Sequence, residues 1–189
     1  MTTIMPAFGR PFTAQGSIIG RLLAGYGELE LELCFCATAA RNDFNMVFKA
    51  MFRPRGESQR IQIADAIARE PFHEKKLGTL FDETIGAVAF CLKIRNQYAH
   101  CYWTTDFGKQ LGFVVMEETA RDNKRVDNVL ALKTRHLDAK TLKAQEAYFV
   151  HTRDCLRYLA GEFNLRAGRS ASRRYAIPKK VMRPNLYSP

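Results

Sequence analysis

The side chains best suited to chemistry are gathered in one short segment, Ile94–Trp103, which reads Ile-Arg-Asn-Gln-Tyr-Ala-His-Cys-Tyr-Trp. An arginine guanidinium is always charged and its fork of N–H groups matches phosphate oxygens. The imidazole of a histidine titrates near neutral pH, so it can accept or donate a proton under physiological conditions. A cation, an imidazole and a phenol together suit the binding and cleavage of a phosphodiester, and they suit an apolar core poorly.

The spacing predicts that this segment ends a long helix, from about Thr79 to Tyr102. The apolar ridge of that helix is interrupted by Arg95 after Phe81, Ile85, Val88 and Leu92. Tyr102 lies seven positions after Arg95 and returns to nearly the same azimuth, while Asn96 and His100 are four apart and share the neighbouring face. We therefore expect these four side chains to span less than half of the helix circumference, beside the face that packs.

The segment resembles the signature of HEPN domains (higher eukaryotes and prokaryotes nucleotide-binding), which is R-x-x-x-x-H with a polar residue often following the Arg. Arg95, Asn96 and His100 match that signature. The longer form R-x-x-x-x-H-x-Y, typical of HEPN toxins paired with a minimal nucleotidyltransferase antitoxin, is matched by Arg95, His100 and Tyr102. The resemblance covers these eight positions and the helical layout, whereas the chain is longer than the short HEPN toxins.

The resemblance implies a metal-independent endoribonuclease, in which the Arg and His of two subunits face a shared cleft in a homodimer. His100 would then act as general acid–base on the ribose 2′-OH or the leaving oxygen, and Arg95 would stabilise charge on the phosphorane oxygens. Asn96 would orient the His or the phosphate, and Tyr102 would bind substrate. In the antitoxin-paired branch the matching Tyr is also an AMPylation target, which makes Tyr102 a candidate switch.

Other interpretations of the same residues stay open. Arg95 could form a buried ion pair with Glu28, Glu32 or Glu83, and His100 could cap the helix near its last carbonyls. Tyr98 and Trp103 suit packing or a dimer interface better than ligand binding. The principal alternative in function is a non-catalytic HEPN-like module that binds nucleic acid, a nucleotide or a protein.

The remaining periodicity predicts an all-α fold, an up-and-down bundle of four or five helices with a small inserted β-hairpin. Within 28–33 a period-two alternation competes with helix, and we favour helix because three- and four-residue spacing continues on both sides. We expect an irregular arm at 1–13, a helical domain at 14–166 with the hairpin or loop at about 104–137, and a flexible basic tail at 167–189. The expected helices cover Gln15–Arg41, Asp43–Phe52, Glu57–Glu70, with Pro71 beyond its end, and Asp138–Arg166; the expected strands cover Leu111–Met116 and Val129–Leu137.

The positive charge is concentrated in the tail. The chain has 29 Lys plus Arg against 19 Asp plus Glu, a formal net charge of +10, yet no acidic residue follows Glu162. Cationic tails are often present for solubility alone, but cations interleaved with Tyr175 and Tyr187 would attract RNA in a salt-dependent way. We expect nucleic-acid contacts from Arg169, Arg173, Arg174, Lys179 and Lys180.

Other classes of protein lack support in the sequence. We expect no metal site, because Glu28, Glu30 and Glu32 have no His or Cys placed beside them, and no cofactor, because no phosphate-binding glycine motif is present. The five cysteines show no C-x-x-C spacing, and three lie in apolar helical contexts where a thiol behaves as a small hydrophobe. The cysteine usage favours a reduced, cytoplasmic protein. No stretch approaches the roughly 20 apolar residues of a membrane span, so we expect no contact with membranes.

Overall fold

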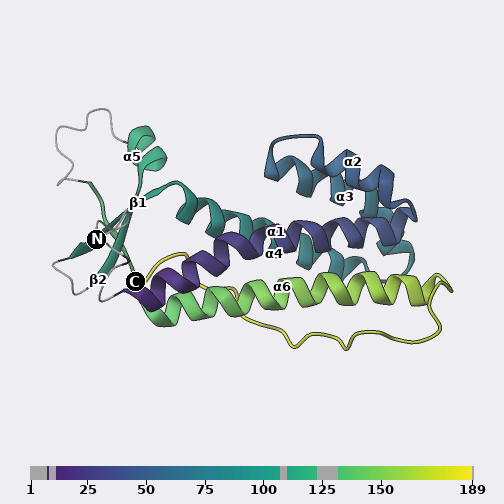
Figure 1. The fold of residues 1–189 in the computed structure, drawn as a ribbon. Coiled ribbons are helices and arrows are strands. Elements are labelled where there is room, and N and C mark those ends of the chain that lie inside the picture. Colours follow the sequence, from purple (N-terminus) through teal and green to yellow (C-terminus); the bar gives the residue numbers. More distant parts are fainter. Residues whose placement is uncertain (1–7, 9–11, 107–109, 123–131, 189) are drawn as a thin grey trace. The chain divides into compact units, whose positions relative to one another are not determined.

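The protein is mainly helical, with one small sheet. The structure, a computed structural model, describes residues 8, 12–106, 110–122 and 132–188 (Figure 1). The helices are α1 (Thr13–Arg41), α2 (Phe44–Phe52), α3 (Glu57–Glu74), α4 (Gly78–Ala99), α5 (Met116–Asp122) and α6 (Ala139–Arg166). The strands β1 (Cys101–Asp106), β2 (Gln110–Val115) and β3 (Arg135–Leu137) form an antiparallel sheet in the order β1-β2-β3. The expected predominance of helix is confirmed, although six helices and three strands occur among the described residues where four or five helices and one hairpin were expected.

The chain forms two compact units, and the long helices contribute to both. The helical unit comprises Gly25–Lys93 and Tyr148–Met182, and it contains α2, α3 and most of α1, α4 and α6. The sheet unit comprises Met1–Ala24, Ile94–Ala147 and Arg183–Pro189, and it contains the three strands and α5.

A cluster of phenylalanines joins three helices in the core of the helical unit. Phe72 of α3 is fully buried, with its ring 4.8 Å from that of Phe81 on α4 and 4.7 Å from that of Phe163 on α6. Burial of one such ring stabilises the fold by roughly 1.5–3 kcal/mol. The cluster therefore fixes the end of α3 against its neighbours.

This cluster explains why the expected end of α3 is wrong. The sequence predicts that the helix stops at Glu70 before Pro71, but α3 continues to Glu74 with Pro71 inside it. Proline fixes a helical φ and removes only one backbone donor. Burial of Phe72 in the next position compensates for that lost hydrogen bond, so the last turn persists.

The expectation for α1 is confirmed, including the segment where alternation suggested a strand. The helix runs without a break through 28–33 and ends where Asn42 takes a left-handed conformation with φ of 58°. Asn is one of the few residues that tolerates this conformation at a helix end. Asp43 then begins α2, because its carboxylate accepts the Met46 N–H at 2.9 Å as an N-cap.

In the sheet unit the expected hairpin needs correction. The two predicted segments do pair as β2 and β3, with Leu111 opposite Leu137, but α5 and residues 123–131 lie between them, and 123–131 fall outside the described residues. The additional strand β1 pairs with β2 along its whole length, with Trp103 opposite Phe113. Strand β1 was not expected, because the helical periodicity predicted that α4 continues to Tyr102.

The segment after Arg166 contains no helix or strand among its described residues, 167–188. Its final part is nevertheless fixed within the sheet unit. The Ser188 N–H donates to the His136 carbonyl at 2.9 Å, and the Ser188 Oγ accepts the Asp138 N–H at 2.9 Å. Residues 1–7 and 9–11 of the expected arm lie outside the described part of the chain.

Within the described residues, no helix has both the length and the apolar character that a membrane crossing needs.

Glu162 gives the helical unit a pH-dependent contribution to stability. Its side chain is 3% exposed and accepts hydrogen bonds from Arg173 at 2.9 Å and Arg166 at 3.0 Å. The Arg173 hydrogen bond, with that of Arg166, lowers the pKa of Glu162 below its ordinary value of 4.5. The carboxylate therefore stabilises the fold above pH 4.5, and the contribution is lost as the pH falls through the lowered pKa.

We predict that Glu162→Gln lowers the free energy of unfolding by about 1 kcal/mol between about pH 6 and pH 8. The effect stays small because the two arginine side chains are 36% and 55% exposed, where water screens the charges. Below pH 4.5 the difference from wild type should shrink, as urea denaturation at each pH will measure. Glu70→Gln, on an exposed position of α3, is the control; a constant difference down to pH 3 would contradict the prediction.

Candidate functional site

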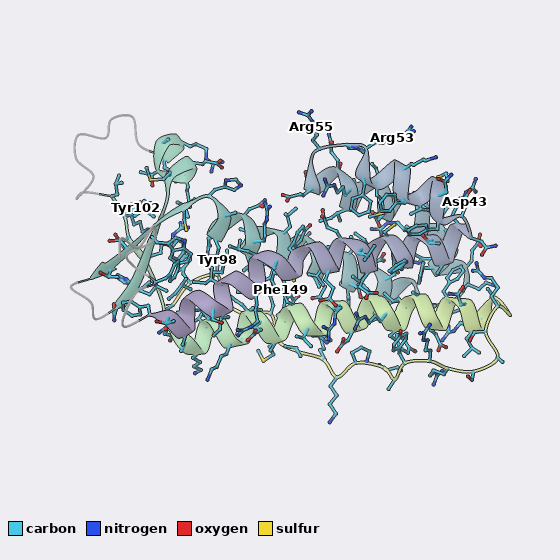
Figure 2. All side chains as sticks on the ribbon, viewed as in Figure 1. Asp43, Arg53, Arg55, Tyr98, Tyr102 and Phe149 are labelled. Atoms are coloured by element: carbon cyan, nitrogen blue, oxygen red, sulfur yellow. The ribbon has the colours of Figure 1, made fainter. Side chains whose placement is uncertain are left out.

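The four motif residues lie where α4 ends and β1 begins. Arg95 and Asn96 occupy the last turn and are half-buried, and the Arg95 Nη1 donates to the Asn96 Oδ1 at 2.9 Å. His100 is exposed in the single-residue link between helix and strand, and its N–H donates to the Asn96 carbonyl at 3.1 Å. Tyr102 lies on β1 and is 57% exposed, beyond the end of α4 in Figure 2.

The expected common helical face is therefore wrong for Tyr102. Because α4 stops at Ala99, the azimuth that an extended helix would give Tyr102 does not apply. The physical reason is local: Tyr102, Trp103 and the two threonines that follow are residue types that favour strands, and their pairing with β2 buries Phe113 completely. Arg95, Asn96 and His100 remain adjacent, and Tyr102 is presented by the strand.

The buried face of α4 also differs from the expected ridge. In the last turns Ile94, Gln97 and Tyr98 are buried, whereas Arg95 and Asn96 are half-buried and Ala99 is exposed. Arg95 thus lies at the border of the packed face rather than within it. Its hydrogen bond to Asn96 limits the motion of the guanidinium.

A buried hydrogen-bond network holds the end of α4. The Tyr98 hydroxyl donates to the Oε1 of Gln145 on α6, and burial raises the pKa of Tyr98, so the phenol stays protonated. The Gln145 Nε2 donates to the carbonyls of Asn185 at 2.8 Å and Leu186 at 3.1 Å. The Gln97 Nε2 donates to the same Leu186 carbonyl at 2.9 Å. Two glutamines therefore connect α4, α6 and the end of the chain.

Aromatic packing fixes β1 against the same turn. The Trp103 ring lies 5.6 Å from the rings of both Tyr98 and Phe113, and 4.9 Å from Phe8. Aromatic pairs at such separations contribute about 0.5–1.5 kcal/mol each beyond the area they bury. Tyr98 and Trp103 thus pack within the unit, in line with their expected structural role.

The cysteine beside His100 is not an activated nucleophile. Burial raises the pKa of the Cys101 thiol to about 12, and its Sγ donates to the Tyr98 carbonyl at 3.6 Å. A neutral thiol is a poor nucleophile. All five cysteines are free, and four of them are buried.

The carboxylates considered as partners for Arg95 have other cations beside them in the helical unit. Glu28 and Glu32 contact Arg157 at 3.0 and 2.7 Å, and Glu83 lies 4.0 Å from Lys180. Glu30 is paired with Arg60 at 2.8 Å. Among the described residues no group of three or more His, Cys, Asp and Glu side chains is placed so that it could hold a metal ion.

The five tail cations expected to contact nucleic acid differ in their surroundings. Arg169 donates to the Asn42 Oδ1 at 2.8 Å and to the Ala39 carbonyl, and Arg173 pairs with Glu162. Arg174 lies over the ring of Tyr175 at 5.6 Å, and Lys179 is exposed. Lys180, the fifth, is the exposed partner of Glu83. Arg169 and Arg173 thus contribute to the fold. The other three cations, Arg174, Lys179 and Lys180, are exposed to solvent.

Sequence reasoning missed one surface of the helical unit, a row of phenylalanines on α1 and α2. Phe35, Phe44 and Phe48 are 43%, 46% and 41% exposed. A signal was available, because Phe44, Phe48 and Phe52 recur every four residues while Val47 and Met51 lie between them. A short helix with large apolar residues on two faces has more apolar surface than one core contact can bury.

Comparison with known proteins adds no support to the resemblance to HEPN domains, which is based on the R-x-x-x-x-H-x-Y motif. The chain matches no protein-family model, and neither a curated protein nor a solved structure gives a significant match.

We predict that Tyr98→Phe destabilises the protein by about 1–3 kcal/mol, because the buried Gln145 Oε1 loses its donor. Urea denaturation followed by circular dichroism measures the change. Tyr102→Phe, which removes the same hydroxyl from a position that is 57% exposed, is the matched control and should leave stability unchanged. Equal midpoints for Tyr98→Phe and wild type would mean that the network does not hold the end of α4.

Proposed function

We propose that the protein is a HEPN-like, metal-independent endoribonuclease of the toxin type. In this proposal its helices form an up-and-down bundle, and it acts on RNA in the cytoplasm. The observation that supports it is the placement of the R-x-x-x-x-H-x-Y residues. They lie at a solvent-accessible helix–strand junction, with exposed His100 and Tyr102 beside half-buried Arg95, and the junction is held by a buried network. A site that must bind a substrate and stay rigid needs this combination.

The chemistry proposed for the site is attack of a ribose 2′-OH on the adjacent phosphorus. His100 accepts the proton of the 2′-OH, or donates one to the departing 5′-oxygen, as general acid–base. The 2′-oxygen forms the new P–O bond while the bond to the 5′-oxygen breaks. Arg95 stabilises the charge on the phosphorane oxygens, and its contact with Asn96 at 2.9 Å keeps the guanidinium oriented. Tyr102 contacts the substrate, and DNA resists cleavage because it lacks the nucleophile.

The proposal includes a homodimer, in which Arg95 and His100 of two copies face one cleft. It also includes a nucleotidyltransferase-type antitoxin that modifies Tyr102. The exposure of the Tyr102 hydroxyl-bearing ring supports such modification, since an AMP transferase must reach the oxygen. Addition of AMP there would place a bulky anion beside His100.

We predict that His100→Ala lowers the rate of RNA cleavage by about 10²- to 10⁴-fold and leaves RNA affinity within a factor of two, because the imidazole moves protons rather than holding the substrate. Arg95→Ala should weaken both cleavage and binding. The measurement is cleavage of mixed single-stranded RNAs in the presence of EDTA, together with binding by fluorescence anisotropy. His73→Gln, at an exposed histidine of α3, is the control.

The alternative is the non-catalytic binding module, and the same assay separates it. Wild-type protein that binds these RNAs in EDTA and leaves them intact, with an affinity that depends on Arg95, would favour the module. If Arg95→Ala loses folding stability but no ligand affinity changes, the motif has a structural role and does not bind a ligand.

A further inference from the structure

The phenylalanine ridge (Phe35, Phe44, Phe48 and Phe52) is an unusual feature of the helical unit. Successive ring centroids along it are 5.8, 5.4 and 4.8 Å apart. The first three rings are more than 40% exposed, and Phe52 is half-buried. Contiguous exposed apolar surface of this kind marks interaction sites in soluble proteins, whereas scattered single residues do not.

Core packing does not account for the ridge. On α2 the residues that pack inward are Val47 and Met51, both fully buried. Phe44 and Phe48 lie on another face of the same helix, at the four-residue spacing that aligns side chains along one side. The exposed rings therefore remain after α2 has satisfied its own contacts with the core.

Cations lie on the segment that carries most of the ridge, α2 and the link that follows it. Lys49 on α2, and Arg53 and Arg55 on the link between α2 and α3, are exposed, and they form no ion pair within the described part of the chain. Figure 2 shows Arg53 and Arg55 on this link. Arg41, just before α2, is exposed as well. Asp43 is the acidic residue of this stretch, and its carboxylate is engaged as the helix cap.

This charge pattern selects the kind of partner. Two copies of the chain meeting through the ridge would bring Lys49, Arg53 and Arg55 of both copies together with few acidic groups to offset them, and like charges across an interface oppose association. A polyanion with flat apolar groups complements the surface instead. Single-stranded RNA has both properties, since its phosphates pair with cations and its bases stack on aromatic rings.

The ridge continues into a cavity of about 740 Å³ within the same unit. Phe35 belongs to both, and Tyr175 lines the cavity with its ring 37% exposed. Arg174, which lies over Tyr175 at 5.6 Å, and Asn164 supply polar groups to the lining. The carboxylate of the lining, Glu32, is paired with Arg157 at 2.7 Å. Cavities that hold small ligands measure about 300–1,000 Å³, so this one has room for a nucleotide.

We propose that the ridge and this cavity form a binding track for single-stranded RNA. Bases stack on Phe44 and Phe48 and enter the cavity lined by Phe35 and Tyr175. The phosphates contact Lys49, Arg53, Arg55 and Arg174. The track takes its ligand class from the proposed function, but it is a surface of the helical unit, whereas Arg95 and His100 belong to the sheet unit.

The test uses the full chain and a fluorescein-labelled 2′-O-methyl oligouridine of about 12 nucleotides, which lacks the nucleophilic 2′-OH and therefore reports binding without cleavage. Phe44→Ser combined with Phe48→Ser should weaken the affinity at least tenfold, in line with the cost of removing stacked aromatics. Ile177→Ser combined with Met182→Ser, at apolar positions that are 65% and 89% exposed, is the control and should bind as wild type does. Circular dichroism verifies that each variant is folded.

Charge gives a second, independent measurement. Arg53→Gln combined with Arg55→Gln should reduce the slope of log affinity against log salt concentration by about 0.7 for each lost phosphate contact. Lys140→Gln combined with Lys143→Gln removes two exposed cations from α6 in the sheet unit and should leave the slope unchanged.

Wild-type affinity in the Phe44→Ser, Phe48→Ser variant would overturn the track. If that variant also had a lower molar mass by light scattering, the ridge would be assigned to contact between copies of the chain. If the protein binds the oligonucleotide through the ridge but cleaves no RNA, the proposed nuclease activity is wrong and the binding track is supported. If the protein cleaves RNA but its binding does not depend on the ridge, the track is wrong and the nuclease activity is supported.

Discussion

The hydrogen bond from the Tyr98 hydroxyl to the Gln145 side chain is the contact on which the candidate site depends. Both side chains are buried, and a buried polar group without a partner costs about 1–3 kcal/mol, so each one requires the other. Gln145 also holds the carbonyls of Asn185 and Leu186, and through them the end of the chain. The position of Arg95, Asn96 and His100 follows from this arrangement, because they belong to the helical turn and link that Tyr98 anchors.

Helix periodicity predicted most of the fold because amphipathic patterns report directly which face packs. α1, α2 and α6 have the expected bounds to within two residues, and Asp138 begins α6 as an N-cap whose carboxylate accepts the Thr141 N–H. The failures have a tertiary origin. Burial of Phe72 carries α3 past Pro71, and pairing of β1 with β2 ends α4 at Ala99. A local pattern cannot register a partner that is distant in sequence.

The candidate site, too, was predictable where it depends on local spacing and not where it depends on tertiary contacts. Spacing along one helix placed Arg95, Asn96 and His100 together, but Tyr102 depends on a strand that forms only by pairing with β2. Arg169 and Arg173 hold the tail to α1 and α6 through residues more than ten positions away in the sequence. The local sequence around the two arginines does not indicate these partners. The phenylalanine ridge was visible as a spacing, yet its exposure becomes known only when the inward face of α2 is known. Rigid support for the motif and an exposed aromatic, cationic surface are both features that RNA recognition requires.

The chemical identity of the RNA ends after incubation with the wild-type protein in EDTA tests the central claim most directly. In the proposed mechanism, attack by the 2′-OH with the help of His100 and Arg95 would leave a 2′,3′-cyclic phosphate on one fragment and a 5′-hydroxyl on the other, which mass spectrometry of the fragments distinguishes. We expect these two ends, and no cleavage where the nucleotide preceding the scissile bond is 2′-deoxy. Fragments with 3′-hydroxyl ends, or cleavage at the 2′-deoxy position, would contradict the proposed attack by the ribose 2′-OH.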